Sequence, residues 1–148
     1  MSAARQPVGD APQGHVALVT GGAGAIGAAV CAALAAQGRR VAAADLDRAR
    51  AAAVAEPLGG AGVAMDVADP ESVARAIDEV RARLGPPTVL VSCAGWDRML
   101  PFLETDEPFQ ARVLEINLAG PIRVTRAVLP DMIAAGFGRI VLVSSDAA

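Results

Sequence analysis

A glycine-rich run near the N-terminus has the residue types and spacing of a phosphate-binding loop. It reads Gly21-Gly22-Ala23-Gly24-Ala25-Ile26-Gly27 and separates an apolar segment from an Ala-rich one. Glycines permit a tight turn through which backbone N–H groups approach a pyrophosphate, and a following helix adds its partially positive N-terminus. The residues expected to line the pyrophosphate are Gly21, Gly24, Ala25 and Ile26, whereas Gly27 would allow close packing of the helix on the sheet. The alternative is an ordinary strand-to-helix turn.

An acidic residue, Asp45, ends the next apolar segment 18 residues after Gly27. A carboxylate at this point can accept hydrogen bonds from both ribose hydroxyls of NAD, and it would repel the 2′-phosphate of NADP. Arg40 lies at the far end of that segment, whereas Arg48 lies nearer and would soften the preference. The alternative is that Asp45 only caps the following helix. These residues predict a dinucleotide site that takes NAD.

The elements that must position these residues alternate along the chain. Apolar stretches typical of buried strands cover 15–20, 40–45, 62–66, 88–92 and 139–144. Helical patterns cover 25–37, 48–58, 69–84 and 105–136, and Asp69-Pro70-Glu71 is a favourable helix start. Strands joined by helical crossovers predict a parallel sheet covered on both faces. We expect an α/β, doubly wound Rossmann fold with strand order 3-2-1-4-5, truncated after its fifth strand.

Composition excludes several classes of protein. The 148 residues suffice for one domain, expected over 15–148, after a disordered extension over 1–14 that has no signal-peptide pattern. A net charge of -3 with mixed signs indicates neither a nucleic-acid surface nor a membrane surface. One histidine and two unpatterned cysteines, Cys31 and Cys93, predict no metal site and reduced thiols in the cytoplasm. Glycines interrupt the uncharged stretch 16–38, which therefore does not indicate a membrane span.

On these motifs the chain resembles the classical short-chain dehydrogenase/reductase family over nearly all of 16–148. The family pattern Thr-Gly-x-x-x-Gly-x-Gly corresponds to 20–27, with Ala25 where the middle glycine usually stands. Cofactor binding would be weakened rather than lost if Ala25 keeps a negative φ. The resemblance implies that Asp66 and Val67 contact the adenine, and that the Asn-Ala-Gly beside the nicotinamide is here Cys93-Ala94-Gly95. A thiol hydrogen-bonds weakly, so the tie between strand ends is in doubt, and we interpret Cys93 as a structural substitution rather than as a nucleophile.

The resemblance also implies two catalytic positions, Asn117 and Ser145. The backbone carbonyl of Asn117 would hold a water in a proton relay, and Pro121 gives an independent reason, because it lacks the N–H that an α-helix would pair with this carbonyl. Ser145 would hydrogen-bond the substrate oxygen. The family's acid/base pair, Tyr-x-x-x-Lys, has no counterpart, because the sequence contains no Tyr and all 13 of its basic residues are Arg.

The function implied is NAD(H)-dependent interconversion of a secondary alcohol and a ketone. Short stretches at 94–97, 101–102 and 145–148 resemble 2-hydroxycyclohexanecarboxyl-CoA dehydrogenases, relatives of 3-oxoacyl-thioester reductases, so a hydroxyacyl-CoA is the first expected substrate. One alternative is a truncated, catalytically silent nucleotide-binding module, and another is a subunit whose partner supplies Tyr and Lys. Family relatives are commonly tetramers, and an uncovered strand at 139–144 would also favour association, so a homo-oligomer is expected.

Overall fold

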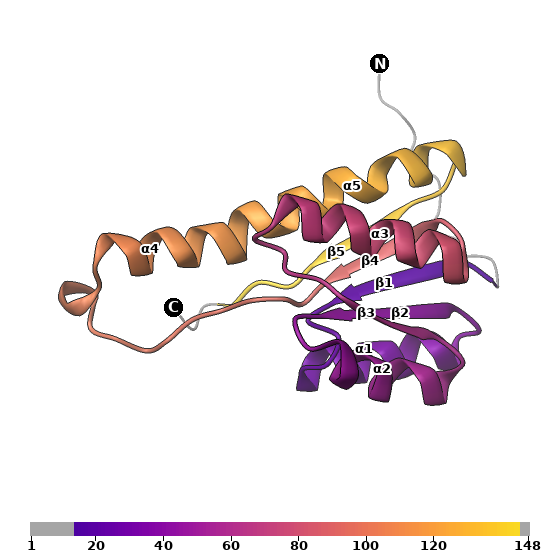
Figure 1. The fold of residues 1–148 in the computed structure, drawn as a ribbon, viewed down its shortest axis with the longest axis horizontal. Helices are drawn as coiled ribbons and strands as arrows, with labels where there is room; N and C mark the ends of the chain where they lie inside the picture. Colours follow the sequence, from indigo (N-terminus) through magenta and orange to yellow (C-terminus); the bar gives the residue numbers. More distant parts are fainter. Residues whose placement is uncertain (1–13, 146–148) are drawn as a thin grey trace, which may run out of the picture.

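The computed structural model describes residues 14–145, so the extension expected over 1–14 lies outside the described residues except for Gly14. One parallel five-stranded sheet has the order β3-β2-β1-β4-β5 (Figure 1). The strands are β1 Val16–Thr20, β2 Arg40–Asp45, β3 Ala61–Ala64, β4 Pro87–Ser92 and β5 Arg139–Leu142. The prediction of a doubly wound α/β fold with this strand order is confirmed.

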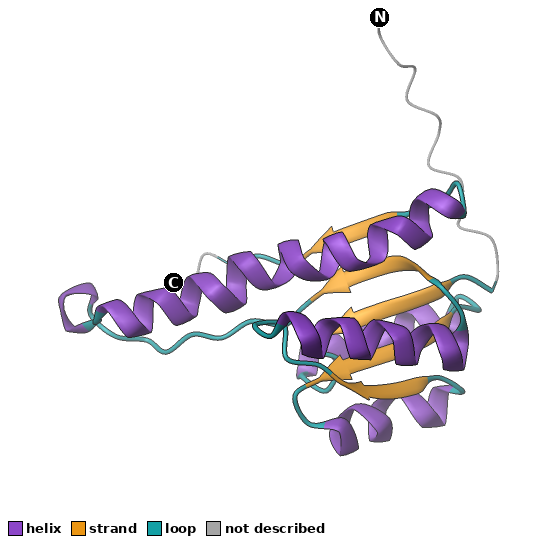
Figure 2. Cartoon of the chain, turned by 45° about the horizontal axis from the view of Figure 1, so that its top comes forward, coloured by secondary structure: helices purple, strands orange, loops and turns teal. Residues whose placement is uncertain are grey.

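Helices cover both faces of the sheet, as Figure 2 shows. The helices are α1 Ala25–Ala36, α2 Arg48–Ala55, α3 Pro70–Leu84, α4 Glu107–Leu114 and α5 Gly120–Ala134. Alternate residues of one strand point to opposite layers, so Leu18 joins the core under α3 and α5, whereas Val19 joins the core under α1 and α2. Both side chains are fully buried. Burial on both faces explains why the strands are continuous apolar runs.

Two predicted boundaries are wrong for physical reasons. Strand β3 ends at Ala64 rather than at Asp66, because Asp66 begins a turn in which its carboxylate accepts a hydrogen bond from Ala68 N (2.9 Å). The helix expected over 48–58 is α-helical only to Ala55 and continues as the 3-10 turn Glu56–Leu58. Gly59 then ends it with a φ of 71°, a left-handed conformation that glycine adopts readily.

The segment expected as one helix over 105–136 is a long rod of three parts, of which α4 extends beyond the sheet (Figure 1). Asp106 caps α4 by accepting from Phe109 N at 2.8 Å. Between α4 and α5 lies a π-helical turn, Glu115–Ala119, in which Gly120 N donates to Glu115 O, five residues earlier. This wider turn directly precedes Pro121, which has no N–H to continue α-helical bonding.

Within residues 14–145, no helix has the length and apolar character needed to cross a membrane. The same residues contain no group of three or more His, Cys, Asp or Glu side chains placed to hold a metal ion.

Candidate functional site

The glycine loop follows β1, the central strand, and packs so tightly that Gly21, Gly22 and Gly27 leave no room for a Cβ. Gly21 has a φ of 63°, and a Cβ there would lie 2.8 Å from Ala94 N. A Cβ on Gly27 would collide with the carbonyl oxygen of Gly21. Gly27 therefore brings α1 against the loop itself, rather than against the sheet as we expected.

The N-terminus of α1 is open to an anion. Gly24 is its N-cap without a side-chain hydrogen bond, and its first turn contains no acidic residue in the described structure. Ala25 and Ile26 are exposed in that turn. Among residues 14–145 only glycines have positive φ, so Ala25 has a negative φ. This is the condition under which we expected alanine to weaken cofactor binding rather than abolish it. The free N–H groups and the helix dipole suit a phosphate.

Asp45 lies at the end of β2 and holds the tip of the glycine loop. Its Oδ2 accepts a hydrogen bond from Ala23 N (3.0 Å), and its Oδ1 accepts from Asp47 N (3.4 Å). The cap of α2 is Asp47, which accepts from Ala49 N (2.9 Å) and Arg50 N (3.1 Å). The alternative that Asp45 serves as the helix cap is therefore wrong, and its carboxylate faces the loop.

The arginine beside this carboxylate is not the predicted one. Arg48 turns away to form an ion pair with Glu79 of α3. Arg50 instead donates from Nη2 to Ala23 O (3.1 Å). Arg40 donates to Gly14 O at the far end of β2, as its position in the sequence predicts. Residues two apart on a helix point to different sides, so Arg48 and Arg50 contact different partners.

A cavity of about 550 Å³ lies between the segments that follow β2 and β3 and the rod. It is lined by Leu46, Asp66, Ala68, Ala111, Arg112, Glu115 and Ile116. Of the two residues predicted to contact adenine, Asp66 lines this cavity, whereas Val67 is buried beside it. The carbonyl of Val67 accepts from Arg123, and a Cβ on Gly120 would lie 2.9 Å from Val67 Cγ2.

Thr20 ties the ends of β1 and β4 together. Its Oγ1 lies 3.2 Å from Ser92 Oγ and accepts from Ala94 N at 3.2 Å, while its carbonyl accepts from Cys93 N at 3.1 Å. The replacement of asparagine by Cys93 put the connection between the strand ends in doubt, but Thr20 makes this connection. In the sequence analysis Thr20 was only the first residue of the glycine-loop pattern. Burial raises the pKa of the Cys93 thiol, which disfavours the reactive thiolate.

Asn117 uses its side chain in a way that the sequence did not reveal. Its Oδ1 accepts from Trp96 N (2.8 Å) and its Nδ2 donates to Trp96 O (2.7 Å). The Trp96 ring packs against Phe109 (centroids 5.3 Å apart) and under the Arg112 guanidinium (4.6 Å). Asn117 lies in the π-helical turn Glu115–Ala119 rather than in an α-helix, so the α-helical argument from Pro121 does not apply directly. The relay water stays a prediction.

Ser145 emerges at the same edge of the sheet as the 93–95 segment. Val143 N donates to Ser92 O (3.0 Å), so pairing with β4 continues past the end of β5, and Ser145 follows two residues later in an exposed position. The structure therefore brings β4, the glycine loop and the serine to one edge, where ligands bind in open α/β sheets.

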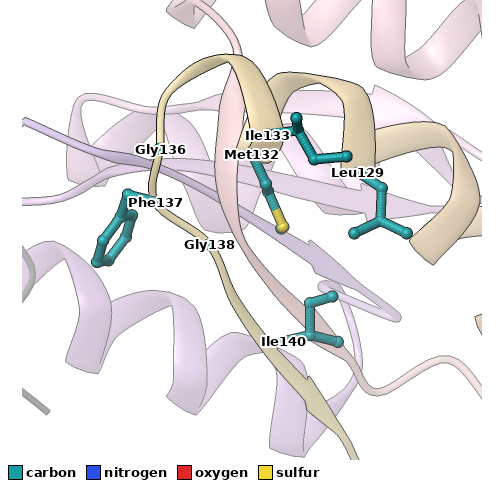
Figure 3. A pocket seen from close by; sticks show the side chains of 7 residues that line it. All are labelled: Leu129, Met132, Ile133, Gly136, Phe137, Gly138 and Ile140. Atoms are coloured by element: carbon teal, nitrogen blue, oxygen red, sulfur yellow. The ribbon is translucent and has the colours of Figure 1, made fainter. Parts of the chain in front are cut away.

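An apolar groove of about 390 Å³ lies away from this edge, between the end of α5 and β5 (Figure 3). Leu129, Met132, Ile133, Phe137 and Ile140 line it together with two glycines. It offers no polar or titratable side chain, so it contributes no chemistry to the candidate site.

Comparison with known proteins decides the family. The family model described as short chain dehydrogenase matches residues 15–148. The chain belongs to the short-chain dehydrogenase family. Its members are oxidoreductases, so the resemblance found in the sequence is confirmed.

Several similar proteins are longer than this chain. D-threitol dehydrogenase of Mycolicibacterium smegmatis is 44% identical over 140 residues, covering 91% of this chain and 54% of that protein. Acetoacetyl-CoA reductase of Allochromatium vinosum is 36% identical over 138 residues, covering 88% and 56%. The crystal structure of gox2181 superposes with a TM-score of 0.85 and 36% identity, covering 90% of this chain and 55% of that one. The chain spans about half the length of the curated relatives that it matches.

Proposed function

We propose that this chain is the NAD(H)-binding part of an oxidoreductase that interconverts a secondary alcohol and a ketone. The observation that carries the proposal is Asp45 bonded to Ala23, beside the uncapped start of α1. A carboxylate next to an open helix N-terminus supports the proposal, because a dinucleotide requires a ribose acceptor beside a phosphate site. The cavity lined by Asp66 and by Leu46, the residue after Asp45, has room for a base. The residues therefore fit the cofactor that the family implies.

Each part of the cofactor has residues to hold it. The loop residues Gly21, Gly24, Ala25 and Ile26 would hold the pyrophosphate, and Asp66 would border the adenine with Val67 behind it. The segment Cys93-Ala94-Gly95, fixed by Thr20, would support the nicotinamide. The nicotinamide, when bound, supplies the site that accepts or returns a hydride.

Asp45 supports NAD rather than NADP. Each of its carboxylate oxygens accepts one backbone N–H and keeps a further lone pair, which a ribose hydroxyl can use. A 2′-phosphate would bring like charges together at the same carboxylate. Preference for NAD is therefore the expected outcome of a comparison between the two cofactors.

We propose that the substrate is a secondary alcohol or the corresponding ketone, and a hydroxyacyl-CoA is the first candidate. Ser145 would hydrogen-bond the reacting oxygen, and Asn117 would hold a water of the proton relay. The acetoacetyl-CoA reductase relative supports a CoA thioester, whereas the D-threitol dehydrogenase relative supports a small polyol. Parallel assays with 3-hydroxybutyryl-CoA and with D-threitol separate the two.

A second candidate is a nucleotide-binding module without catalysis. The 148 residues contain no Tyr and no Lys, so they offer no counterpart of the family's acid/base pair. Such a module would bind NADH without turning over substrate. A partner chain that carries Tyr and Lys would restore turnover on mixing.

Trp96 provides the test, because it is the only tryptophan of the chain and directly follows the nicotinamide segment. NADH binding should quench its fluorescence, and turnover should change NADH absorbance when substrate is added. Binding with turnover supports the oxidoreductase, and binding without turnover supports the silent module. A folded chain that leaves the fluorescence unchanged and binds no NADH in calorimetry contradicts both.

We also propose that the protein forms homo-oligomers in a reducing, cytoplasmic compartment. Leu114, Leu118 and Ile122 recur every four residues as exposed apolar side chains of the rod, and all four residues of β5 are exposed. Both features support association through these surfaces. Cys31 and Cys93 are free thiols, which supports the compartment. Sedimentation would show a stable monomer if the association proposal is wrong.

A further inference from the structure

One side chain, that of Arg123, joins two distant parts of the molecule. Its Nη1 donates to the Val67 carbonyl, and its Nη2 pairs with Glu115 Oε1 at 2.5 Å. Val67 follows β3, Glu115 begins the π-helical turn, and Arg123 lies in α5. A single guanidinium therefore connects the segment after β3 to the rod.

Both residues that this guanidinium joins belong to the wall of the cavity of about 550 Å³. Glu115 lines the cavity directly. Val67 lies between two further lining residues, Asp66 and Ala68. The Val67 side chain is buried, and its Cγ2 would lie 2.9 Å from a Cβ on Gly120 at the start of α5. Helix α5 thus holds Val67 from two sides, through its side chain and through its carbonyl.

The π-helical turn makes the pairing of Glu115 with Arg123 possible. Eight residues of a regular α-helix rotate about 80° beyond two full turns, which would point the two side chains in different directions. The turn Glu115–Ala119 is wider and rotates less per residue, so the two side chains come onto one face of the rod. The irregular turn therefore aligns the acid with its partner at the edge of the cavity.

The guanidinium also neutralises an acidic part of the cavity wall. Asp66 and Glu115 both line the cavity, and Asp66 forms no ion pair within residues 14–145. The lining Arg112 stacks on an aromatic ring and pairs with neither acid. Without Arg123, a second unpaired carboxylate would stand in the wall of a site proposed for a nucleotide, whose phosphates are anionic. The Val67 carbonyl would lose a charge-assisted hydrogen bond at the same time.

We propose that Arg123 is a positioning residue of the cofactor site, which fixes the wall of the base cavity by joining Val67 to Glu115. This inference rests on the proposed function above. Arg123 acts through these two residues and does not line the cavity itself. It preforms the cavity for an adenine-containing nucleotide, whatever group the other half of that nucleotide carries.

Nucleotide affinity and stability are measured separately on the full chain. Dissociation constants for NADH and for ADP-ribose come from calorimetry, and free energies of unfolding come from urea curves. Arg123→Gln should weaken the binding of both nucleotides about tenfold, the scale of one charge-assisted hydrogen bond. ADP-ribose contains the adenine but no nicotinamide, so an equal loss for both nucleotides places the effect at the base cavity.

Arg126→Gln is the matched control. Arg126 lies three residues further along α5, is exposed, and forms no ion pair within residues 14–145. Its substitution should leave both affinities unchanged. Arg123→Lys keeps the charge but cannot hold two partners in one planar fork, so its loss should fall between those of Arg123→Gln and Arg126→Gln. It also serves as the second variant if Arg123→Gln does not fold.

A double variant tests the part played by the acid. Adding Glu115→Gln to Arg123→Gln removes the carboxylate that has lost its partner, so it should recover part of the lost affinity for both nucleotides. The absence of any recovery overturns the part assigned to Glu115.

Affinities of the folded Arg123→Gln chain equal to those of Arg126→Gln, with only the free energy of unfolding lowered, make Arg123 a purely structural residue and overturn the inference. The same equality for Arg123→Lys overturns it where Arg123→Gln does not fold. A loss of NADH affinity without a loss of ADP-ribose affinity also overturns it, because the effect then lies outside the base cavity. Failure of the folded natural chain to bind either nucleotide overturns the inference and the proposed function together.

Discussion

The side-chain amide of Asn117 pairs with both backbone polar groups of Trp96. The two hydrogen bonds, 2.8 and 2.7 Å long, join the π-helical turn to the segment that follows β4. Gly95 allows the close approach, since a Cβ there would lie 3.2 Å from Asn117 Oδ1. The residue predicted to act through its backbone carbonyl therefore fixes, through its side chain, the segment that we propose to lie beside the nicotinamide.

Removing this amide should loosen the 93–96 segment. Asn117→Ala loses both bonds and should lower the free energy of unfolding by about 1–2 kcal/mol, measured in urea. The Trp96 emission should shift as the ring becomes more mobile. Gln110→Ala is the control, because that amide on α4 bonds only the exposed Thr105 hydroxyl. Equal effects of the two substitutions on stability and emission would show that the pairing is unimportant.

Comparing alanine substitutions at Gly21 and Gly59 should separate the cost of a left-handed backbone from the cost of a steric clash. Gly59 has a similar positive φ but no atom within 4 Å of an added Cβ, whereas Gly21 faces the Ala94 backbone. Gly59→Ala should cost about 1 kcal/mol from the left-handed conformation alone. Gly21→Ala should cost about 1–3 kcal/mol more from overpacking, and it should also abolish NADH binding. Similar unfolding curves for the two variants would refute the collision.

The fold was predictable because the strands are largely continuous apolar runs and several helices have clear start or stop signals. Asp69-Pro70 at the start of α3 is an example, since Asp69 accepts from Glu71 N (2.9 Å). A predicted strand boundary was wrong where a side chain, rather than a neighbouring strand, accepts a backbone hydrogen bond. The Asp66 carboxylate does this just after the end of β3. The sequence shows that an aspartate can form such a bond, but it does not show whether this bond or continued strand pairing prevails.

The site was less predictable, because its geometry depends on contacts between distant elements. The motif positions Gly21 and Asp45 could be identified from spacing alone. Thr20, Arg50 and the side chain of Asn117 could not, because their partners are 20 or more residues away, as in the Ala23–Arg50 bond (27 residues) and the Trp96–Asn117 bonds (21). The choice of Arg48 over Arg50 failed for the same reason, since Glu79 lies 31 residues from Arg48.

Arg81 should be the most important ion-pairing residue of α3. Its Nε donates to Asp131 Oδ2 of α5 (2.9 Å), and its Nη2 donates to the Ala127 carbonyl (3.3 Å). Arg81→Met would leave the largely buried Asp131 carboxylate unpaired and should cost about 1–3 kcal/mol in urea unfolding. Arg75→Met is the matched control, because Arg75 pairs only with exposed acids of its own helix and cap, and it should cost under about 0.5 kcal/mol. Equal costs would mean that the bridge between α3 and α5 adds nothing.

Alkaline pH should destabilise the protein mainly through its cysteines. Burial raises the pKa of the Cys31 thiol from 9.0 to about 11, and it also raises the pKa of Cys93. Because the chain has no Tyr and no Lys, and arginine stays protonated, cysteines are the side chains that titrate between pH 9 and pH 11.

The sign of this effect follows from which state keeps the proton. Below pH 9 both folded and unfolded chains hold the Cys31 proton, so its contribution to stability is fully present. Between pH 9 and about pH 11 the unfolded chain loses that proton while the folded chain keeps it, so the free energy of unfolding falls as pH rises. Raising the Cys31 pKa from 9.0 to about 11 corresponds to a total loss of about 2–3 kcal/mol above pH 11, most of which is reached by pH 10.5. Urea unfolding at pH 8 and pH 10.5 measures it, with Cys31→Ala as the comparison. The variant should lose less stability over this interval than the natural chain, and an equal loss in both would place the titration elsewhere.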